Sequence, residues 1–358
     1  MEIEINSLNW YGRTLDNDGI RYFDYSSSGF SFVLTGKKAE ATFVSDPKSW
    51  DETTKAVLGI YISETDEDSW KTFPDEPTFR CTLNQKENEC VLFESEEEKT
   101  VCIRVVKLSE AAFGYAGLKA LAVEGKIQKS VKNFKGPKIE FIGDSITCGY
   151  GIDGVWSETT HFSTQTERAD KSYAFLTSKQ MDSEFQCCSW SGIGITSNYV
   201  DPETVNLPYT AWLMPANWPY TDKSLSLRLK LEPEVWDQKR FSPDIVVIHL
   251  GTNDISWVRD VEERRLNFVA QYRQLIEAVH RRSPSAKICC ILGVMGESLN
   301  KSVQEAVDLF SKDFPKVTIK TVFCHEQDEK DGIAIDWHPS AKTHKKVADR
   351  LVKALKDM

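Results

Sequence analysis

The pattern of apolar residues changes near residue 130, and this change constrains the fold more than any other feature of the sequence. Beyond it, short apolar runs such as KIEFIG, FQCCSW, DIVVIHL and KICCILG alternate with stretches of helical spacing. Alternating strands and helices favour a mostly parallel, doubly wound sheet with helices on both faces. We therefore expect residues 131–358 to form an α/β/α domain that ends in a helix.

Residues 1–130 have a different pattern, in which short runs rich in Val, Ile, Tyr, Phe and Thr are separated by polar turns. Examples are GFSFVLTG, KAEATFVS, ECVLFES and KTVCIRVVKL, and several alternate apolar with polar residues, as strands with one face in water do. These runs predict an antiparallel β-sandwich, in the form of a jelly roll. The polar, basic segment GKIQKSVKNFKGPK then marks the boundary between the two domains.

Charge and composition restrict the partners. The 358 residues include 44 Lys and Arg against 54 Asp and Glu, a formal charge of −10. Such a surface repels phosphate backbones, so we expect neither nucleic acid nor a membrane as a partner. The first residues, MEIEINSLNWYGR, lack the basic and apolar regions of a secretion signal, which predicts a cytoplasmic protein. The sequence leaves the oligomeric state open, a homo-oligomer included.

The cysteines do not predict a metal centre. There are nine, an odd number, and two pairs are vicinal, which disfavours disulfides within each pair. Most lie in apolar, strand-like runs, where a free thiol behaves as a small buried hydrophobe. No CxxC motif or clustered His/Cys spacing suggests zinc. We expect free thiols, no metal and no cofactor.

Ser145 lies in the sequence FIGDSIT, at the end of the first apolar strand of the α/β half. Catalytic sites in open α/β sheets lie at such carboxyl ends of strands. A serine that opens a helix there exposes its hydroxyl, and the backbone N–H groups of the helix can bind an oxyanion. The same position also suits a serine that only caps the helix.

Two further segments follow strands of the same sheet. Asn253 belongs to LGTND, directly after DIVVIHL, and a side-chain amide there can donate to a developing oxyanion. Gly192 belongs to SWSGIG, after FQCC, where a glycine allows a backbone N–H to approach a substrate closely. Each segment, considered alone, is also compatible with an ordinary turn.

His338 is the best candidate for the base that a nucleophilic serine needs. It lies in IDWHPS, before the last predicted helix, and Pro339 restricts the backbone that follows it. Asp336, two residues earlier, shares a side of an extended segment with His338, so its carboxylate could reach Nδ1 while Nε2 faces Ser145. The other five histidines lie in an apolar strand, on predicted helices or in polar stretches without an equally well-placed Asp.

In this order, the segments GDSITCGYG, SGIGI, LGTND and DWHP resemble the four sequence blocks of the SGNH, or GDSL, hydrolases. The resemblance implies that Ser145 attacks an acyl carbonyl and that His338 shuttles the proton. It also implies an oxyanion hole formed by the backbone N–H groups of Ser145 and Gly192 and the side chain of Asn253. The superfamily usually places its acid three residues before the histidine, where this chain has Ile335. Both a Ser-His-Asp triad and a Ser-His dyad oriented by a backbone carbonyl therefore remain open.

A narrower resemblance covers nearly the whole chain. The opening WYGR, the RYFDYSSSGFSFVLTG stretch, RADKSYAFL and the DWHP form of the last block are similar to carbohydrate esterase family 2, in which a β-sandwich precedes the SGNH domain. That family removes acetyl groups from plant cell-wall polysaccharides such as xylan and glucomannan. The resemblance implies an acetylxylan esterase-like enzyme that acts on acetylated carbohydrate.

Aromatic residues near the proposed site agree with a sugar substrate, because sugar rings stack on exposed aromatic faces. We expect substrate contacts from four tryptophans, two beside the catalytic segments and two in the loop PYTAWLMPANWPYTD: Trp337, Trp190, Trp212 and Trp218. Packing in a core is the other role open to each of them.

Three functions remain open. The favoured one is a metal-independent serine esterase that removes O-acetyl groups from acetylated xylo- or manno-oligosaccharides through an acyl-enzyme. The second is a lipid or thioester hydrolase on the same scaffold, which would require an apolar acyl tunnel. The third is a carbohydrate-binding protein in which the hydrolase domain is inert.

Overall fold

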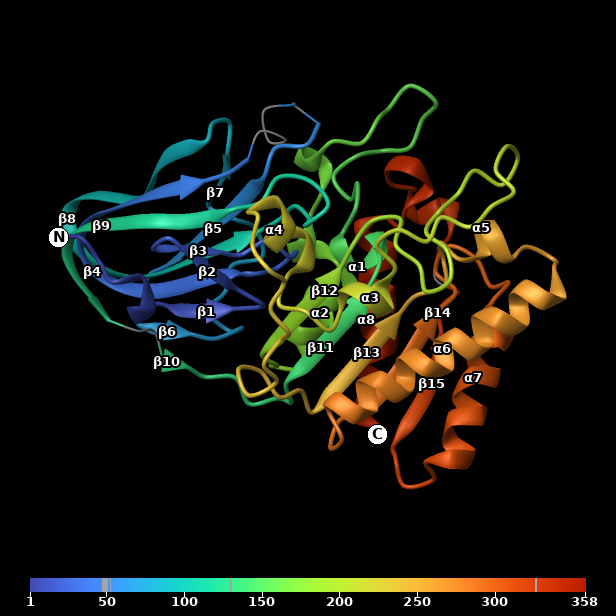
Figure 1. Ribbon diagram of the computed structural model, residues 1–358. Coiled ribbons are helices and arrows are strands. Elements are labelled where there is room, and N and C mark those ends of the chain that lie inside the picture. Colours follow the sequence, from blue (N-terminus) through green and yellow to red (C-terminus); the bar gives the residue numbers. More distant parts are fainter. Residues whose placement is uncertain (47–50, 52, 129–130, 326) are drawn as a thin grey trace.

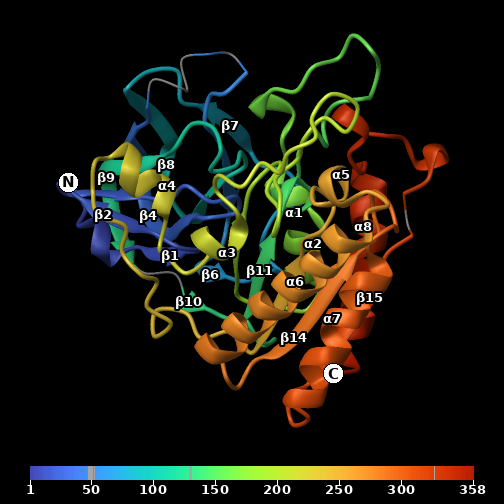
Figure 2. The same ribbon diagram turned by 45° about the vertical axis from the view of Figure 1, so that its right-hand side comes forward.

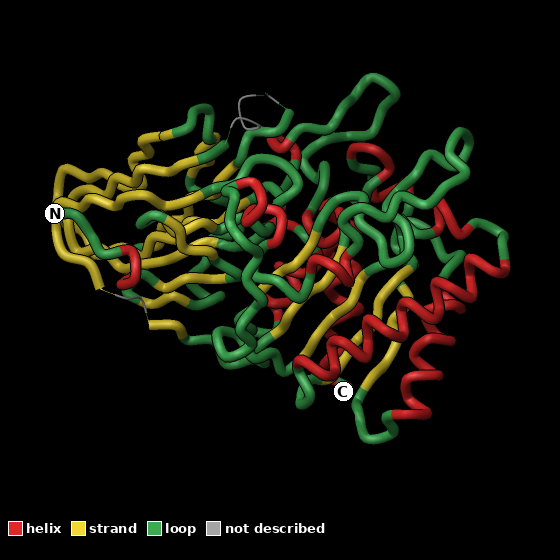
Figure 3. Tube along the Cα trace, in the orientation of Figure 1, coloured by secondary structure: helices red, strands yellow, loops and turns green. Residues whose placement is uncertain are grey.

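The computed structural model describes residues 1–46, 51, 53–128, 131–325 and 327–358. Strands fill the N-terminal half of the molecule, and the helices lie mainly in the C-terminal half around a second sheet (Figures 1 and 3). This two-part architecture confirms the predicted fold class, an antiparallel β-domain followed by a parallel α/β domain. The boundary at residue 130 stays a prediction, because residues 129–130 lie outside the described residues.

The N-terminal half is built on an antiparallel sheet of eight strands among the described residues, with the order β2-β3-β9-β4-β8-β5-β7 and β1 on β4. Its strands are β1 (Asn9–Tyr11), β2 (Leu15–Asn17), β3 (Ile20–Tyr22), β4 (Gly29–Val44), β5 (Val57–Ser63), β7 (Phe79–Thr82), β8 (Glu87–Lys107) and β9 (Gly117–Gln128). β6 (Glu67–Asp68) and β10 (Val131–Lys132) form a small parallel pair. Inward-facing Phe30, Phe32 and Leu34 alternate along β4 and belong to the core of this half. The jelly-roll arrangement stays a prediction.

Two pairs of strands expected to be separate are each one long strand. GFSFVLTG and KAEATFVS join as β4, and ECVLFES and KTVCIRVVKL join as β8. The β4–β8 register shifts between Gly36 and Lys38, so the glycine marks a bulge and not a turn. A Cβ on Gly36 would lie 2.2 Å from the carbonyl oxygen of Glu124 in β9, which shows how closely the two backbones approach there.

The C-terminal half contains a parallel sheet with the order β12-β11-β13-β14-β15 in the described part of the chain. Its strands are β11 (Ile139–Gly143), β12 (Phe185–Ser189), β13 (Ile245–His249), β14 (Lys287–Leu292) and β15 (Ile319–Phe323). Every neighbouring pair is parallel, as the alternating sequence pattern predicts. The carboxyl ends of all five strands therefore lie at one edge.

Helices cover both faces of the parallel sheet (Figure 2). One face packs against α6 (Glu262–Arg282) and α7 (Asn300–Asp313), and the other against α2 (Tyr173–Gln180) and α8 (Ala341–Lys356). The shorter elements are α1 (Ser145–Cys148), α3 (Met214–Asn217), α4 (Lys223–Arg228), α5 (Ile255–Val258), and the 3-10 turns η1 (Ile5–Ser7), η3 (Thr164–Thr166), η4 (Ala169–Lys171), η5 (Glu329–Asp331) and η6 (Ile335–Trp337). None of the described helices is long and apolar enough to cross a membrane.

The vicinal cysteines lie on strands buried on both faces. Cys188 and Cys290 point into the core beside α6 and α7, while Cys187 and Cys289 point into the core beside α2 and α8. Successive side chains on a strand face opposite ways, so the two thiols of each pair are directed apart. All nine cysteines fall among the described residues and are free thiols, as expected.

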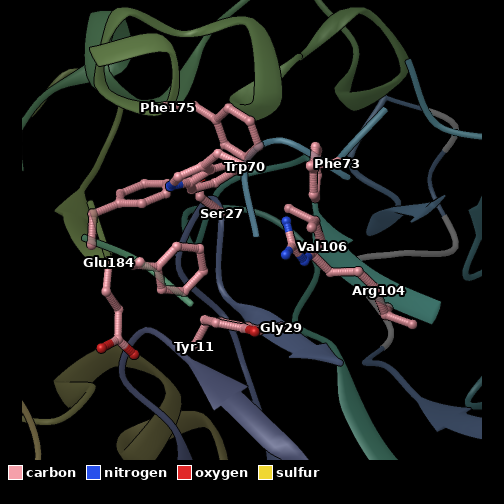
Figure 4. Close-up of a pocket in the computed structure, with 12 residues that line it drawn as sticks. Tyr11, Ser27, Gly29, Trp70, Phe73, Arg104, Val106, Phe175 and Glu184 are labelled. Carbon is pink, nitrogen blue, oxygen red and sulfur yellow. The ribbon is translucent and has the colours of Figure 1, made fainter. Parts of the chain in front are cut away.

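An aromatic seam joins the two halves (Figure 4). Trp70 and Phe73, from the N-terminal half, pack against Phe175 of α2, and the Trp70 indole donates a 2.8 Å hydrogen bond to the carbonyl of Ser183. The Arg104 guanidinium lies 4.1 Å from the Phe73 ring centroid and is paired with Asp68. Because the gap inside the seam is only about 20 Å³, this region is a packed interface.

Candidate active site

The four sequence blocks meet at the carboxyl edge of the parallel sheet. Ser145 opens α1 two residues after β11, Gly192 follows β12, and Asn253 follows β13. His338 comes from the segment between β15 and α8. Ser145, Gly192, Asn253 and His338 line one cavity of about 700 Å³. Parallel topology explains this gathering, since loops after parallel strands emerge at the same edge.

Ser145 and His338 are in direct contact. His338 Nε2 lies 2.8 Å from Ser145 Oγ, the distance of a hydrogen bond through which the imidazole can take the hydroxyl proton. Asp144 caps α1 by accepting the N–H of Ile146 at 3.0 Å. Burial raises the pKa of the Asp144 carboxyl to about 7. This cap fixes the turn from which Ser145 projects.

Backbone carbonyls, and not the Asp336 carboxylate, contact the other ring nitrogen of His338. Nδ1 lies 3.1 Å from the carbonyl oxygens of both Ile335 and Asp336. The Asp336 carboxylate instead accepts a 2.8 Å hydrogen bond from the Tyr150 hydroxyl, and the Tyr150 ring lies 4.2 Å from that of His338. In the described chain, the imidazole is thus held by main-chain acceptors and one aromatic face.

The backbone around Asp336 explains this arrangement. Asp336 and Trp337 both have left-handed conformations, with φ of 51° and 62°. Non-glycine residues seldom adopt this region, and two in succession must be held by their surroundings. Gln327 contributes by donating to the Trp337 carbonyl at 2.8 Å. The resulting turn directs two carbonyl oxygens at His338. An extended segment would instead have directed the Asp336 carboxylate at the imidazole.

Burial lowers the pKa of His338 to about 4, because charging the imidazole in this site costs solvation. A general base must be neutral, so the active form dominates above that pKa and is lost on acidification. We therefore expect kcat/KM to stay level from pH 7 to about pH 5 and to fall tenfold per unit below about pH 4.

Initial rates across this pH range check the expected acid limb, with circular dichroism at each pH to confirm that the protein stays folded. An acid limb near the ordinary histidine pKa of 6.5 would contradict the assignment.

Donors for an oxyanion lie beside Ser145. Gly192 has φ of 74°, a conformation that favours glycine, and its N–H has no protein acceptor within the part of the chain that the structure describes. Asn253 Nδ2 donates one N–H to the carbonyl of Ile193 at 2.9 Å, which leaves its second N–H for a ligand. Ser145 is the first residue of α1, so its own N–H has no intrahelical acceptor.

Asp254 anchors the segment that follows Gly192. Its buried carboxylate accepts the backbone N–H groups of Ile195, Thr196 and Ser197 at 2.6 to 3.2 Å, and the Thr196 hydroxyl at 2.7 Å. Such a set of donors holds a carboxylate and a loop rigidly together. This role of Asp254 was not predicted from the sequence, although Asp254 is the last residue of the LGTND block and a buried acid after a strand signals such an anchor.

The catalytic cavity continues into two others. A pocket of about 630 Å³ shares Ser191, Gly192 and Tyr199 with it, and a pocket of about 500 Å³ shares Trp156 and Trp337. Because the three cavities share lining residues, they form one groove that includes Ser145. Trp337 is 54% exposed and lines the same cavity as Ser145. It packs edge-on against Trp156, so the face of its ring is available to a ligand.

The other expected tryptophans differ in their placement. Trp212 is 42% exposed and lines the neighbouring pocket, and the partly buried Trp190 lines it too while packing edge-on against Tyr25. Trp218 is only 1% exposed and belongs to the core of the α/β half. The predicted substrate contact of Trp218 is therefore wrong, because its ring is covered by packing and cannot meet a sugar.

The chain matches a known protein family. Residues 141–346, more than half of the chain, match the GDSL-like lipase/acylhydrolase family. The chain belongs to this family.

Three similarities are more specific. The chain is 34% identical over 224 residues to cellulase/esterase CelE of Acetivibrio thermocellus, covering 62% of this chain and 25% of that protein. It is 24% identical over 352 residues to an acetylxylan esterase / glucomannan deacetylase of Cellvibrio japonicus, covering 97% and 87%. A family two carbohydrate esterase from Clostridium thermocellum, solved with cellohexaose, matches with a TM-score of 0.82 at 26% identity and 98% coverage of both chains. The chain thus spans only a quarter of CelE and most of the Cellvibrio protein.

Proposed function

We propose that the protein is a serine esterase that removes O-acetyl groups from plant-derived carbohydrate. The observation that carries this proposal is the 2.8 Å contact of His338 with Ser145, in a groove that also holds the free donors of Gly192 and Asn253. A nucleophile, a base and oxyanion donors around one point are the parts that acyl transfer requires.

In the proposed reaction, Ser145 Oγ attacks the acetyl carbonyl while its proton passes to His338 Nε2. The oxyanion is bound by the N–H groups of Ser145, Gly192 and Asn253. His338 then protonates the departing sugar hydroxyl, which leaves an acetyl-enzyme. A water that loses its proton to His338 attacks this ester, and collapse releases acetate and restores Ser145. The carbonyls of Ile335 and Asp336 hold the imidazole throughout, and Asp336 assists only through its charge.

Several features support carbohydrate as the substrate class. The relatives named above include an acetylxylan esterase / glucomannan deacetylase and an esterase solved with cellohexaose. In this chain the groove extends beyond Ser145 and carries the exposed side chains of Trp337, Trp212 and Tyr199. An open aromatic groove suits a sugar chain better than a long acyl group, which needs an enclosed apolar tunnel. We extend the proposal to short acetylated xylo- or manno-oligosaccharides and to a cytoplasmic location.

Acetate release from acetylated xylo- and manno-oligosaccharides, compared with hydrolysis of 4-nitrophenyl acetate and 4-nitrophenyl octanoate, tests the proposal. We expect acetyl esters to be cleaved and the octanoyl ester to react poorly. Replacing Trp337 by Ala should lower kcat/KM on the oligosaccharides about tenfold, as expected for loss of a stacking face, and leave 4-nitrophenyl acetate nearly unaffected.

Phe162 provides a matched control, since it stacks on Tyr150 and lies outside the residues that line the three pockets. Phe162→Leu should not discriminate between the two acetyl substrates. A preference for the octanoyl ester would favour the lipid or thioester hydrolase. Folded wild-type protein that binds the oligosaccharides but releases no acetate would favour the inert binding protein.

A further inference from the structure

A buried carboxylate of the N-terminal half reaches the proposed oxyanion loop. Glu110 follows β8 in a segment that crosses to the α/β half, and its side chain is fully buried. Its Oε2 accepts the backbone N–H of Ser191 at 2.6 Å, and its Oε1 accepts the Ser191 hydroxyl. Ser191 directly precedes Gly192. A single carboxylate therefore accepts both hydrogen-bond donors of the residue next to the proposed oxyanion donor.

The same carboxylate also contacts the helix of the nucleophile. Cys148, the last residue of α1, directs its thiol at Glu110 Oε2 at 3.8 Å and at Ser189 Oγ at 3.2 Å. Glu110 thus lies between the helix that begins with Ser145 and the loop that carries Gly192. The relative position of these two segments decides whether the oxyanion donors surround the carbonyl that Ser145 attacks.

A second buried acid lies beside Glu110. The Glu167 carboxyl lies within 4.8 Å of the Glu110 carboxyl. Burial raises the pKa of Glu167 well above its usual range, and the nearby charge of Glu110 raises it further. Burial also raises the pKa of Glu110, but the two hydrogen bonds from Ser191 and the charge of Lys107 act to lower it. The negative charge of the pair is therefore better stabilised on Glu110 than on Glu167.

Other contacts hold the Glu110 backbone in place. The buried Lys107 ammonium donates to the carbonyls of Ser109 and Glu110, at 3.2 and 2.9 Å, and lies 3.5 Å from Asp24. Glu167 Oε2 accepts the Glu110 N–H at 3.0 Å. With its backbone and side chain both fixed, Glu110 cannot follow a displaced loop without breaking buried hydrogen bonds.

We infer that Glu110, contributed by the β-domain, is a positioning residue that sets the oxyanion loop against the nucleophile. It touches neither substrate nor reacting atoms and acts through Ser191 and Gly192. The inference rests on the proposed role of Gly192 in the oxyanion hole. It makes the β-domain a part of the catalytic apparatus and not only a neighbouring module.

Two variants of different severity test it, Glu110→Gln and Glu110→Ala. Gln keeps one acceptor oxygen but loses the charge-assisted bonds, and Ala removes both acceptors. We expect kcat on 4-nitrophenyl acetate to fall about tenfold in Glu110→Gln and about a hundredfold in Glu110→Ala, with KM changed less than about twofold. Glu110→Gln should therefore retain more activity than Glu110→Ala, and this graded loss is the result that a positioning role predicts.

The second readout is the rate at which a fluorophosphonate probe labels Ser145. Its phosphoryl oxygen occupies the oxyanion site whatever the natural substrate is, so the labelling rate should fall in parallel with kcat. The final extent of labelling counts the folded sites. A merely structural role would lower this extent, or the melting temperature, without slowing the rate per folded site.

Tyr61→Phe is the matched control. The buried Tyr61 hydroxyl also joins the two halves, donating to Asp170 at 2.6 Å, but it touches neither Ser191 nor Cys148. We expect a loss of stability in this variant with a wild-type labelling rate. If both Glu110 variants fail to fold, Ser191→Ala removes the Oγ bond from the other side and should slow labelling at least about threefold.

Wild-type labelling rates in the folded Glu110 variants, or in Ser191→Ala where those do not fold, would overturn the inference. A wild-type protein that is labelled at Ser145 but releases no acetate from any sugar would instead overturn the proposed function alone. The two failures are therefore distinguishable.

Discussion

Ser145→Ala is expected to lower kcat for ester hydrolysis by about 10⁴-fold or more, since no acetyl-enzyme can form without the Oγ nucleophile. The residual rate would come from the oxyanion donors and from binding, which the variant leaves in place. Initial rates of acetate release, together with trapping of the acetyl-enzyme in the wild type by mass spectrometry, check this result.

Ser178→Ala is the matched control for this variant. Ser178 is a buried serine of α2 that donates a 2.9 Å hydrogen bond to the carbonyl of Ala174, away from the catalytic cavity. Ser178→Ala should therefore leave kcat for ester hydrolysis unchanged. If Ser145→Ala kept more than about a tenth of the wild-type rate, covalent catalysis through Ser145 would be excluded.

The second large effect distinguishes a dyad from a triad. His338→Ala should lower kcat by about 10⁴-fold, because the base that takes the Ser145 proton is gone. Asp336→Asn should lower it by less than about tenfold, since the carbonyls of Ile335 and Asp336 that contact Nδ1 remain. The Tyr150 hydroxyl can still donate to the Asn amide oxygen, so the local structure persists.

Parallel kinetics of the two variants at pH 7 measure the contrast. A modest loss in Asp336→Asn is expected because the negative charge of Asp336 favours the imidazolium and raises the pKa of His338. If Asp336→Asn lost as much activity as His338→Ala, the carboxylate would be the orienting acid after all, and the site would be a triad.

Much of the fold was predictable from the sequence, because the pattern of apolar residues in each half is the one that its kind of sheet requires. Strands such as IVVIH are buried along their whole length and apolar except for His249, as parallel strands covered on both faces tend to be, and the helices between them leave little choice of architecture. The long strands β4 and β8 could not be foreseen, since Gly36 reads equally as a turn or as a bulge. Only the partner strand, with its backbone lying against that glycine, decides between the two.

The candidate site was predictable to the extent that it depends on strand ends. Ser145, Gly192 and Asn253 each follow a parallel strand, so topology alone brings them together. The orientation of His338 was not predictable, because it depends on the left-handed backbone conformation of Asp336 and Trp337. Residues other than glycine seldom adopt this conformation.

Contacts between distant segments leave no local sequence signal. Trp218 and Trp212 share one irregular loop, yet the first is in the core and the second lies at the groove, because no periodicity shows which side faces inward. Glu110 is 81 positions from Ser191 and belongs to the other half of the molecule. Its contact with the oxyanion loop becomes visible only once the chain is folded.

The aromatic seam of Figure 4 bears on how such a chain can be reused in evolution. Trp70 and Phe73 fill the space beside Phe175, so a parallel sheet inherited without its β-domain would expose large apolar rings to water. Recombination that cuts between the two sheets would uncover these rings on both fragments. We therefore expect the two sheets to be inherited together as one module.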